Sequence, residues 1–293
     1  MSNRTIAPWK IAYGIASGGV VALAYLFVRL RGQGGGLDLF GIAAAFIFVG
    51  HLALWPRLVL RGLRDSRTLV RGALFGVTQV LIFKAQAAGH TSTAIVAATM
   101  GSVFGVLLGR MILKEKLQGL AAVAGALCLL ATLTNPAVLL VSYWGIAAGI
   151  IQGSGAVLAR SMMLDRLSIR QSIAGGYLVA ALCSGVAIAF DASHFEPARI
   201  HLVDVAGTVV IGILAQYCFF YLYKMLDSQR ASTLALSRIP WVLAAESVLF
   251  GRILPPGQLF SGALVIAGSM LFLVDARVFS RRAATVPDEA TTR

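Results

Sequence analysis

Residues 92–133 of the chain read STAIVAATMGSVFGVLLGRMILKEKLQGLAAVAGALCLLATL. Two apolar runs of about 20 residues flank a short charged hinge, LKEKL, and each run is long enough at ~1.5 Å per residue to cross a hydrocarbon core of roughly 30 Å. The stretch therefore predicts a transmembrane helical hairpin.

A similar pattern returns in residues 232–273, where the hinge is GRILPP. Three residue types recur at one offset of 140 positions: Lys84, Ser92 and Thr93 match Lys224, Ser232 and Thr233. Chance matching in a small apolar alphabet is the alternative, and for the glycine and alanine positions alone both readings stay open. The shared offset of lysine, serine and threonine favours an internal duplication.

The composition excludes an ordinary soluble domain, because 58% of the residues are hydrophobic, only 13% are charged and the mean hydropathy is +0.83. We therefore expect a polytopic protein of the lipid bilayer. The net charge of +13 does not indicate nucleic-acid binding, since the basic residues lie between apolar runs and act as topology signals. Cys128, Cys183 and Cys218 lie inside apolar segments, so we expect neither a metal site nor a disulfide framework.

The hydropathy pattern predicts an all-α integral membrane fold with ten transmembrane helices. The first five are expected at 9–28, 39–54 and 73–88 and in the two arms of the hairpin, and the second five at 141–158, 173–190, 205–223, 231–250 and 259–274. Residues 1–136 would form one repeat, 137–276 a second, and 277–293 a disordered tail. An odd number of spans per repeat forces the two copies to cross the membrane in opposite senses, as in inverted-repeat transporters.

The orientation follows from the basic residues. The connection RLVLRGLRDSRTLVRG, residues 57–72, holds five arginines, and such loops face the cytoplasm. We therefore expect a multi-pass protein of the inner (plasma) membrane with both termini and this connection in the cytoplasm.

The sequence resembles the EamA-like transporters of the drug/metabolite transporter (DMT) superfamily across residues 9–274. The features that carry the resemblance are Pro240, Gly251 and Gly262 in the second half, and Glu115 and Gly125 in the first. Two positions depart from the family pattern: Ser102 stands near the first expected proline, and Arg252 replaces the second hinge glutamate. The resemblance implies ten helices in two inverted five-helix repeats and the export of amino acids, other metabolites or drugs.

The resulting prediction is a secondary transporter, an exporter of small polar or amphipathic metabolites that works by alternating access. The alternative is a non-transporting membrane scaffold or sensor on the same fold. We expect no enzyme, no catalytic residues and no cofactor, because Glu246 is the one clearly intramembrane acid and no nucleotide-binding motif occurs.

Polar and aromatic side chains inside the spans predict a substrate cavity lined by both repeats. The predicted cavity residues are Tyr13, Ser17, Gln79, Phe83, Gln86, Trp144, Gln152, Gln216, Phe220, Tyr223 and Trp241. Interhelical hydrogen bonds and interfacial aromatic rings are the alternative explanation for each of them. Two stripes of glycine at every fourth residue, from Gly101 to Gly109 and from Gly145 to Gly153, predict close helix packing, either as static seams or as sliding faces.

Three charged residues are expected within the spans. Lys84 lies near the outer end of its span and is expected to reach the headgroups. Arg238 is expected to face a pathway, since charged residues in a membrane usually do. Glu246 has two readings: a proton-coupling carboxyl, or a neutral carboxyl hydrogen-bonded to a neighbour.

The predicted orientation can be tested by labelling single cysteines in a cysteine-free background with an impermeant maleimide. Arg61→Cys, on the arginine-rich connection, should stay unlabelled in intact cells, whereas Ser193→Cys, on an outer loop, should react. Both should react after permeabilisation, which controls for accessibility. The reverse pattern in intact cells would reject the topology.

Overall fold

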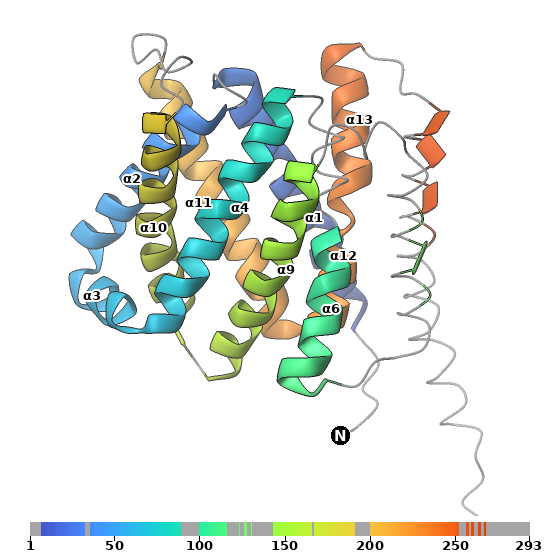
Figure 1. The fold of residues 1–293 in the computed structure, drawn as a ribbon, viewed down its shortest axis with the longest axis horizontal. Helices are drawn as coiled ribbons and strands as arrows, with labels where there is room; N and C mark the ends of the chain where they lie inside the picture. The colour runs from blue at the N-terminus through green and yellow to red at the C-terminus, as the bar shows by residue number, and fades with distance from the viewer. Residues whose placement is uncertain are drawn as a thin grey trace, which may run out of the picture.

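The computed structural model describes residues 7–32, 36–88, 100–115, 143–165, 167–190 and 200–251, with isolated positions in 123–130 and 256–267. In this part of the chain the regular structure is α-helical, and six helices are long and apolar enough to span a membrane (Figure 1). The prediction of an all-α multi-pass membrane protein is therefore confirmed. Most of the spans predicted at the hairpin's second arm and at 259–274, and the predicted tail, lie outside the described residues.

The helices follow the predicted spans closely. In the first half they are α1 Pro8–Arg31, α2 Leu37–Leu54, α3 Pro56–Arg64, α4 Ser66–Ala88 and α6 Met100–Leu113. In the second half they are α9 Tyr143–Leu164, α10 Ile169–Phe190, α11 Leu202–Met225, α12 Ser228–Ala235 and α13 Arg238–Phe250.

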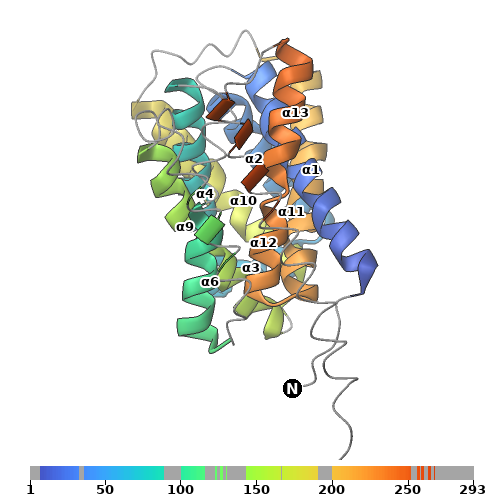
Figure 2. The same ribbon diagram turned by 90° about the vertical axis from the view of Figure 1, so that its right-hand side faces the viewer.

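Helices from the two halves pack against one another throughout the bundle. α4 lies against α9 and α10, while α11 lies against α1 and α2. α6 packs on α9, α13 packs on α1, and α2 meets α10 (Figure 2). The core of the bundle is therefore shared by the two halves.

The arginine-rich connection is not the loop that the sequence predicted. It contains α3, and α4 already begins at Ser66, so that the two helices are separated by Asp65 alone. α3 is amphipathic: Arg57, Arg61 and Arg64 are exposed, whereas Val59 and Gly62 are buried on the side that meets α10. An amphipathic helix satisfies its own backbone groups and keeps its charges in water, which a loop at this position would not do.

The span predicted at 231–250 is also not continuous. α12 ends at Ala235 and α13 begins at Arg238, with short turns in which Leu236 and Ser237 donate backbone hydrogen bonds to residues three positions earlier. Pro240 explains the break, because it has no N–H for the carbonyl of Leu236 and its ring collides with that carbonyl in a regular helix. The break places the first residue of α13 inside the bundle.

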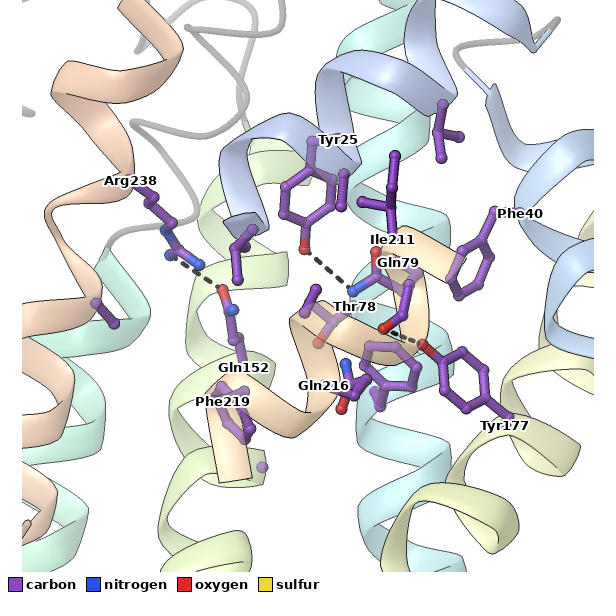
Figure 3. A pocket seen from close by; sticks show the side chains of 18 of the residues that line it. Tyr25, Phe40, Thr78, Gln79, Gln152, Tyr177, Ile211, Gln216, Phe219 and Arg238 are labelled. Carbon is purple, nitrogen blue, oxygen red and sulfur yellow. Dashed lines mark hydrogen bonds between the residues drawn. The ribbon is translucent and has the colours of Figure 1, made fainter. Parts of the chain in front are cut away.

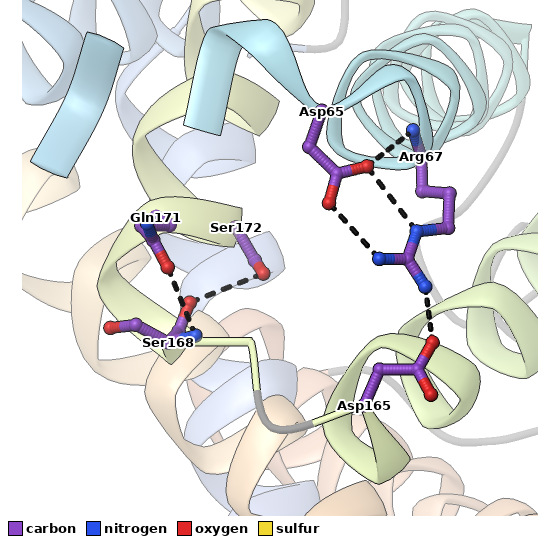
Figure 4. A network of polar contacts seen from close by, with 6 residues as sticks. All are labelled: Asp65, Arg67, Asp165, Ser168, Gln171 and Ser172. Atoms are coloured by element: carbon purple, nitrogen blue, oxygen red, sulfur yellow. Dashed lines mark hydrogen bonds and ion pairs between the residues drawn. The ribbon is translucent and has the colours of Figure 1, made fainter. Parts of the chain in front are cut away.

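A polar network joins the halves at the end of the bundle where α3 lies, called here the arginine-rich end (Figure 4). The Asp65 carboxylate accepts hydrogen bonds from the backbone N–H of Arg67, at 2.9 Å, and from its guanidinium, at 3.2 Å. The same guanidinium donates to Asp165, which follows α9. The hydrogen bond from Arg67 holds the pKa of Asp65 below its ordinary value, so this carboxylate stays charged under all physiological conditions.

The predicted glycine stripes meet each other between α6 and α9. A Cβ atom built on Gly101 would lie 2.2 Å from the carbonyl oxygen of Gly149, and one on Gly153 would lie 2.5 Å from that of Gly101. Contacts this short with backbone atoms leave no room for a side chain. The two helices approach as closely as their backbones allow, as small residues permit in membranes.

This packing predicts a position-specific effect of one methyl group. Gly153→Ala should force α6 and α9 apart and lower the thermal unfolding midpoint in detergent by at least about 3 °C, since overpacking typically costs about 1–3 kcal/mol. Gly155→Ala is the matched control on the same helix, because its Cβ would meet only Leu74, at an ordinary 3.6 Å. Equal midpoints for the two variants would contradict this account of the seam.

Candidate functional site

A cavity of about 120 Å³ lies inside the bundle, several times the volume that one water molecule needs. Helices of both halves line it: α1, α2, α4 and α6 from the first, and α9, α10, α11, α12 and α13 from the second. Figure 3 shows side chains from these helices converging on one space.

The structure brings part of the predicted set to this cavity. Its lining includes Ser17, Gln79, Phe83, Gln152, Gln216, Tyr223 and Arg238. Outside the described lining lie Tyr13, Gln86, Trp144, Phe220, Trp241, Lys84 and Glu246. A role in substrate binding stays a prediction for every residue in both groups.

Two of the predicted aromatic residues make hydrogen bonds between helices instead. The Tyr13 hydroxyl donates to the backbone oxygen of Cys218 at 3.5 Å. The Trp241 indole N–H donates to the backbone oxygen of Ile15 at 3.1 Å, and nearly half of this side chain is exposed. Both contacts fix α1 against helices of the second half.

Lys84 and Trp144 lie together, with the lysine ammonium 5.8 Å from the centre of the indole ring. Gln86 is fully buried, and its side-chain amide has no hydrogen-bond partner within the described part of the chain. Glu246 is buried on α13 with 4% of its surface exposed.

The structure adds a charged residue that sequence reasoning assigned to the loop. Arg71 lies inside α4, is 4% exposed and lines the cavity. Its guanidinium donates to the side-chain oxygen of Gln216 at 2.8 Å. It also lies over three aromatic rings, 4.4 Å from the centre of Phe220, 5.1 Å from Phe75 and 5.5 Å from Phe219. Cation–π contacts of this kind partly compensate the lost hydration of a buried guanidinium.

A signal for Arg71 was present in the sequence. Arg71, Phe75, Gln79 and Phe83 recur at every fourth position, so they share one face of a helix. The predicted face of Gln79 and Phe83 therefore continues back to Arg71, provided that the span is allowed to begin before residue 73.

Uncharged polar groups complete the lining. The Gln79 amide donates to the Tyr25 hydroxyl at 3.1 Å, and the Tyr177 hydroxyl donates to the backbone oxygen of Gly212 at 2.9 Å (Figure 3). Thr78 is 1% exposed, and its hydroxyl has no hydrogen-bond partner among the described residues. An unpaired buried hydroxyl in a cavity is the kind of group that water or a ligand satisfies.

Arg238 begins α13 and reaches the cavity from the side opposite to Tyr177 in Figure 3. Its guanidinium donates to the side-chain oxygen of Gln152 at 3.3 Å. Arg71 and Arg238 are the charged residues of the described lining, which contains no aspartate or glutamate. The cavity therefore carries two positive charges among amide, hydroxyl and aromatic groups.

A reactivity comparison can test whether the cavity holds solvent. In a variant without the native cysteines, Thr78→Cys should react with the small neutral reagent methyl methanethiosulfonate at least about tenfold faster than Ser184→Cys. The two positions are matched in burial, at 1% and 0% exposed, but only Thr78 lines the cavity. Reaction rates are measured by intact-mass spectrometry, and equal rates would mean that the cavity is closed to water.

Residues 139–274 match the EamA-like transporter family, which confirms the resemblance predicted from the sequence for the second half. No curated protein matches the chain. A solved structure, titled only as the crystal structure of a protein, is similar over 92% of this chain and 98% of its own, with 20% identity and a TM-score of 0.66. At this identity the likeness bears on the fold alone.

Proposed function

We propose that the protein is a secondary transporter that exports small polar or amphipathic metabolites by alternating access, because residues 139–274 match the EamA-like transporter family. The observation that carries this proposal is the cavity inside an apolar bundle, with buried charged and amide side chains contributed by both halves. Such groups are costly in a membrane and mark solute pathways.

We further propose ten transmembrane helices in two inverted repeats, residues 1–136 and 137–276. The helix contacts support this. When each helix is replaced by its counterpart in the other half, one contact between the halves becomes another that is also present. The contacts of α4 with α9 and α10 correspond to those of α11 with α1 and α2, and the contact of α6 with α9 corresponds to that of α13 with α1. A two-fold relation between the repeats accounts for this pattern, and inverted repeats place their substrate site at such an interface.

In this proposal the arginine-rich end faces the cytoplasm of a cell with the protein in its plasma membrane, and contacts between the halves hold this end together. Arg67 contacts Asp165 across the halves. Glu115 accepts a hydrogen bond from the backbone N–H of Ser228 at 2.9 Å, and its other oxygen lies 3.4 Å from Arg160. Opening to the cytoplasm would have to break these contacts.

A weaker contact joins the halves where α1 ends and α11 begins. Arg31 and Asp204 lie 3.6 Å apart, and more than half of the arginine side chain is exposed. A pair with one exposed partner contributes little free energy and is partly screened by salt. Alternating access would exchange one set of contacts for the other.

The proposal is tested by counterflow in proteoliposomes, with metabolites first selected by thermal stabilisation of the purified protein. A transporter accumulates labelled solute transiently in vesicles preloaded with the unlabelled compound. A scaffold or sensor on the same fold binds without flux, and an enzyme forms product in detergent without any compartment. Either of these last two outcomes would reject the proposal.

A reversible control is available at the arginine-rich end. Arg67→Cys with Asp165→Cys, joined by a short bifunctional methanethiosulfonate, should stop counterflow, because this end can no longer open. A reducing agent should restore the flux. The single-cysteine variants, treated in the same way, control for modification of each residue alone.

Glu246 is the proposed proton-coupling residue, because it is buried on α13, the helix whose first residue lines the cavity. Glu246→Gln keeps the shape of the side chain and removes its titration. The variant should retain solute exchange and lose the acceleration that an imposed pH gradient produces. Asp38→Asn, at a buried acid outside the cavity lining, should keep that acceleration. Undiminished gradient-driven transport by Glu246→Gln would reject the proton role.

A further inference from the structure

We propose that the transported solute is an organic anion, a compound with a carboxylate or similar group on an apolar or aromatic body. The inference rests on the proposed transport function and names its substrate class. It goes beyond the family match, which covers only the second half and does not distinguish anions from cations or neutral solutes.

The sign of the charge in the cavity is the first argument. Arg71 comes from the first half and Arg238 from the second, and both are 4% exposed. Beside Arg71 the described lining holds no carboxylate. In a site with little water, the positive charge of Arg71 acts strongly on any solute that enters, so it attracts anions and repels cations.

The surroundings of Arg71 give the second argument. A guanidinium has five N–H donors, and among the described residues Gln216 is its hydrogen-bond acceptor. The remaining partners are the ring faces of Phe75, Phe219 and Phe220. These faces attract a cation, but they lack the oxygen lone pairs that accept an ordinary hydrogen bond. A carboxylate offers two acceptor oxygens and the missing negative charge, in the planar geometry that suits a guanidinium.

The start of α13 adds to this field. Helix N-termini carry partial positive charge, and in transporters the ends of interrupted helices point at anionic groups of the substrate. Here Arg238 is the first residue of α13, and it lines the cavity. The break that Pro240 causes therefore places a fixed charge and a helix terminus on the same wall.

The apolar residues of the lining indicate what the uncharged part of the solute is like. Phe40, Phe83, Ile47 and Leu222 surround the polar groups with apolar surface. A strongly hydrated solute such as inorganic phosphate would lose its water against these side chains without compensation. An anion with an aromatic or aliphatic body would bury that body and keep its charge at the arginines.

The inference is tested with three probes that share one aromatic body and differ in charge: phenylacetate, 2-phenylacetamide and phenethylammonium. Binding to the wild-type protein is measured by isothermal titration calorimetry at pH 7 in a neutral maltoside detergent, so that no anionic lipid competes. Phenylacetate should bind at least about tenfold more tightly than the amide, and phenethylammonium should bind most weakly. Equal affinity for the three probes, or a preference for the cation, would overturn the inference without any variant being needed.

Substitutions of single arginines show which residue causes the preference for the anionic probe. Arg71→Gln should weaken phenylacetate binding at least about tenfold, as expected for the loss of a charge-assisted hydrogen bond, and change amide binding by no more than about threefold. Arg64→Gln is the control: it removes the same charge from an exposed position on α3, outside the cavity lining, so affinities should stay at wild-type values. Equal weakening of anion and amide by Arg71→Gln would indicate a structural role and contradict the proposal.

Counterflow separates this inference from the function on which it rests. Flux of neutral or cationic metabolites without flux of anions would leave the transporter assignment standing and reject the anionic substrate. Absence of flux for every compound would reject transport, and the calorimetric ranking would then decide whether the cavity is an anion-binding site. Flux of carboxylates that Arg71→Gln abolishes and Arg64→Gln does not would support both.

Discussion

Close approach of helix backbones is the constraint on which the rest of this bundle depends. Between α1 and the interrupted segment, a Cβ on Gly18 would lie 2.8 Å from the backbone nitrogen of Arg238, so only glycine allows α1 to cover the break. Between α6 and α9 the same requirement falls on Gly101 and Gly153. In a membrane no hydrophobic effect drives helices together, and packing at small residues takes its place. These two seams hold the helices that carry Arg238 and Gln152 to the cavity.

The buried guanidinium of Arg71 is a costly group that this packing supports. Insertion scales place an arginine at the centre of a membrane helix at about +2.5 to 3.5 kcal/mol, and a desolvated cation–π contact returns about 2 kcal/mol. Three rings and the amide of Gln216 therefore offset much of the penalty without neutralising the charge. A cavity without this charge would have a lower free energy in the membrane. This argues that the charge serves to bind a ligand.

The sequence predicted the apolar spans well, because hydropathy and length alone distinguish a membrane helix. It failed where local chemistry competes with that pattern. The arginines of 57–72 predict one cytoplasmic loop, since charge marks topology, but α4 starts at Ser66 and carries Arg71 into the bundle. Pro240 is part of the family resemblance, but apolar periodicity does not show the break that it causes four residues earlier. Polar and aromatic side chains inside apolar runs predict the cavity. This signal identifies the lining residues Gln79, Gln152 and Gln216, but it also selects Trp144 and Trp241, which lie outside the described lining.

The charge of the proposed solute bears on how transport is driven. A monoanion that leaves a cell with a negative interior moves down the membrane potential, which contributes about 2.3 kcal/mol for each 100 mV. This corresponds to roughly a 50-fold concentration ratio, since each 1.4 kcal/mol is a factor of ten. Arg71 and Arg238 remain with the protein in every cycle, so their charges lower the cost of desolvating the anion without altering this driving force. Export of an anion therefore needs no second ion in principle, and proton coupling through Glu246 would serve to build a gradient steeper than the potential supports.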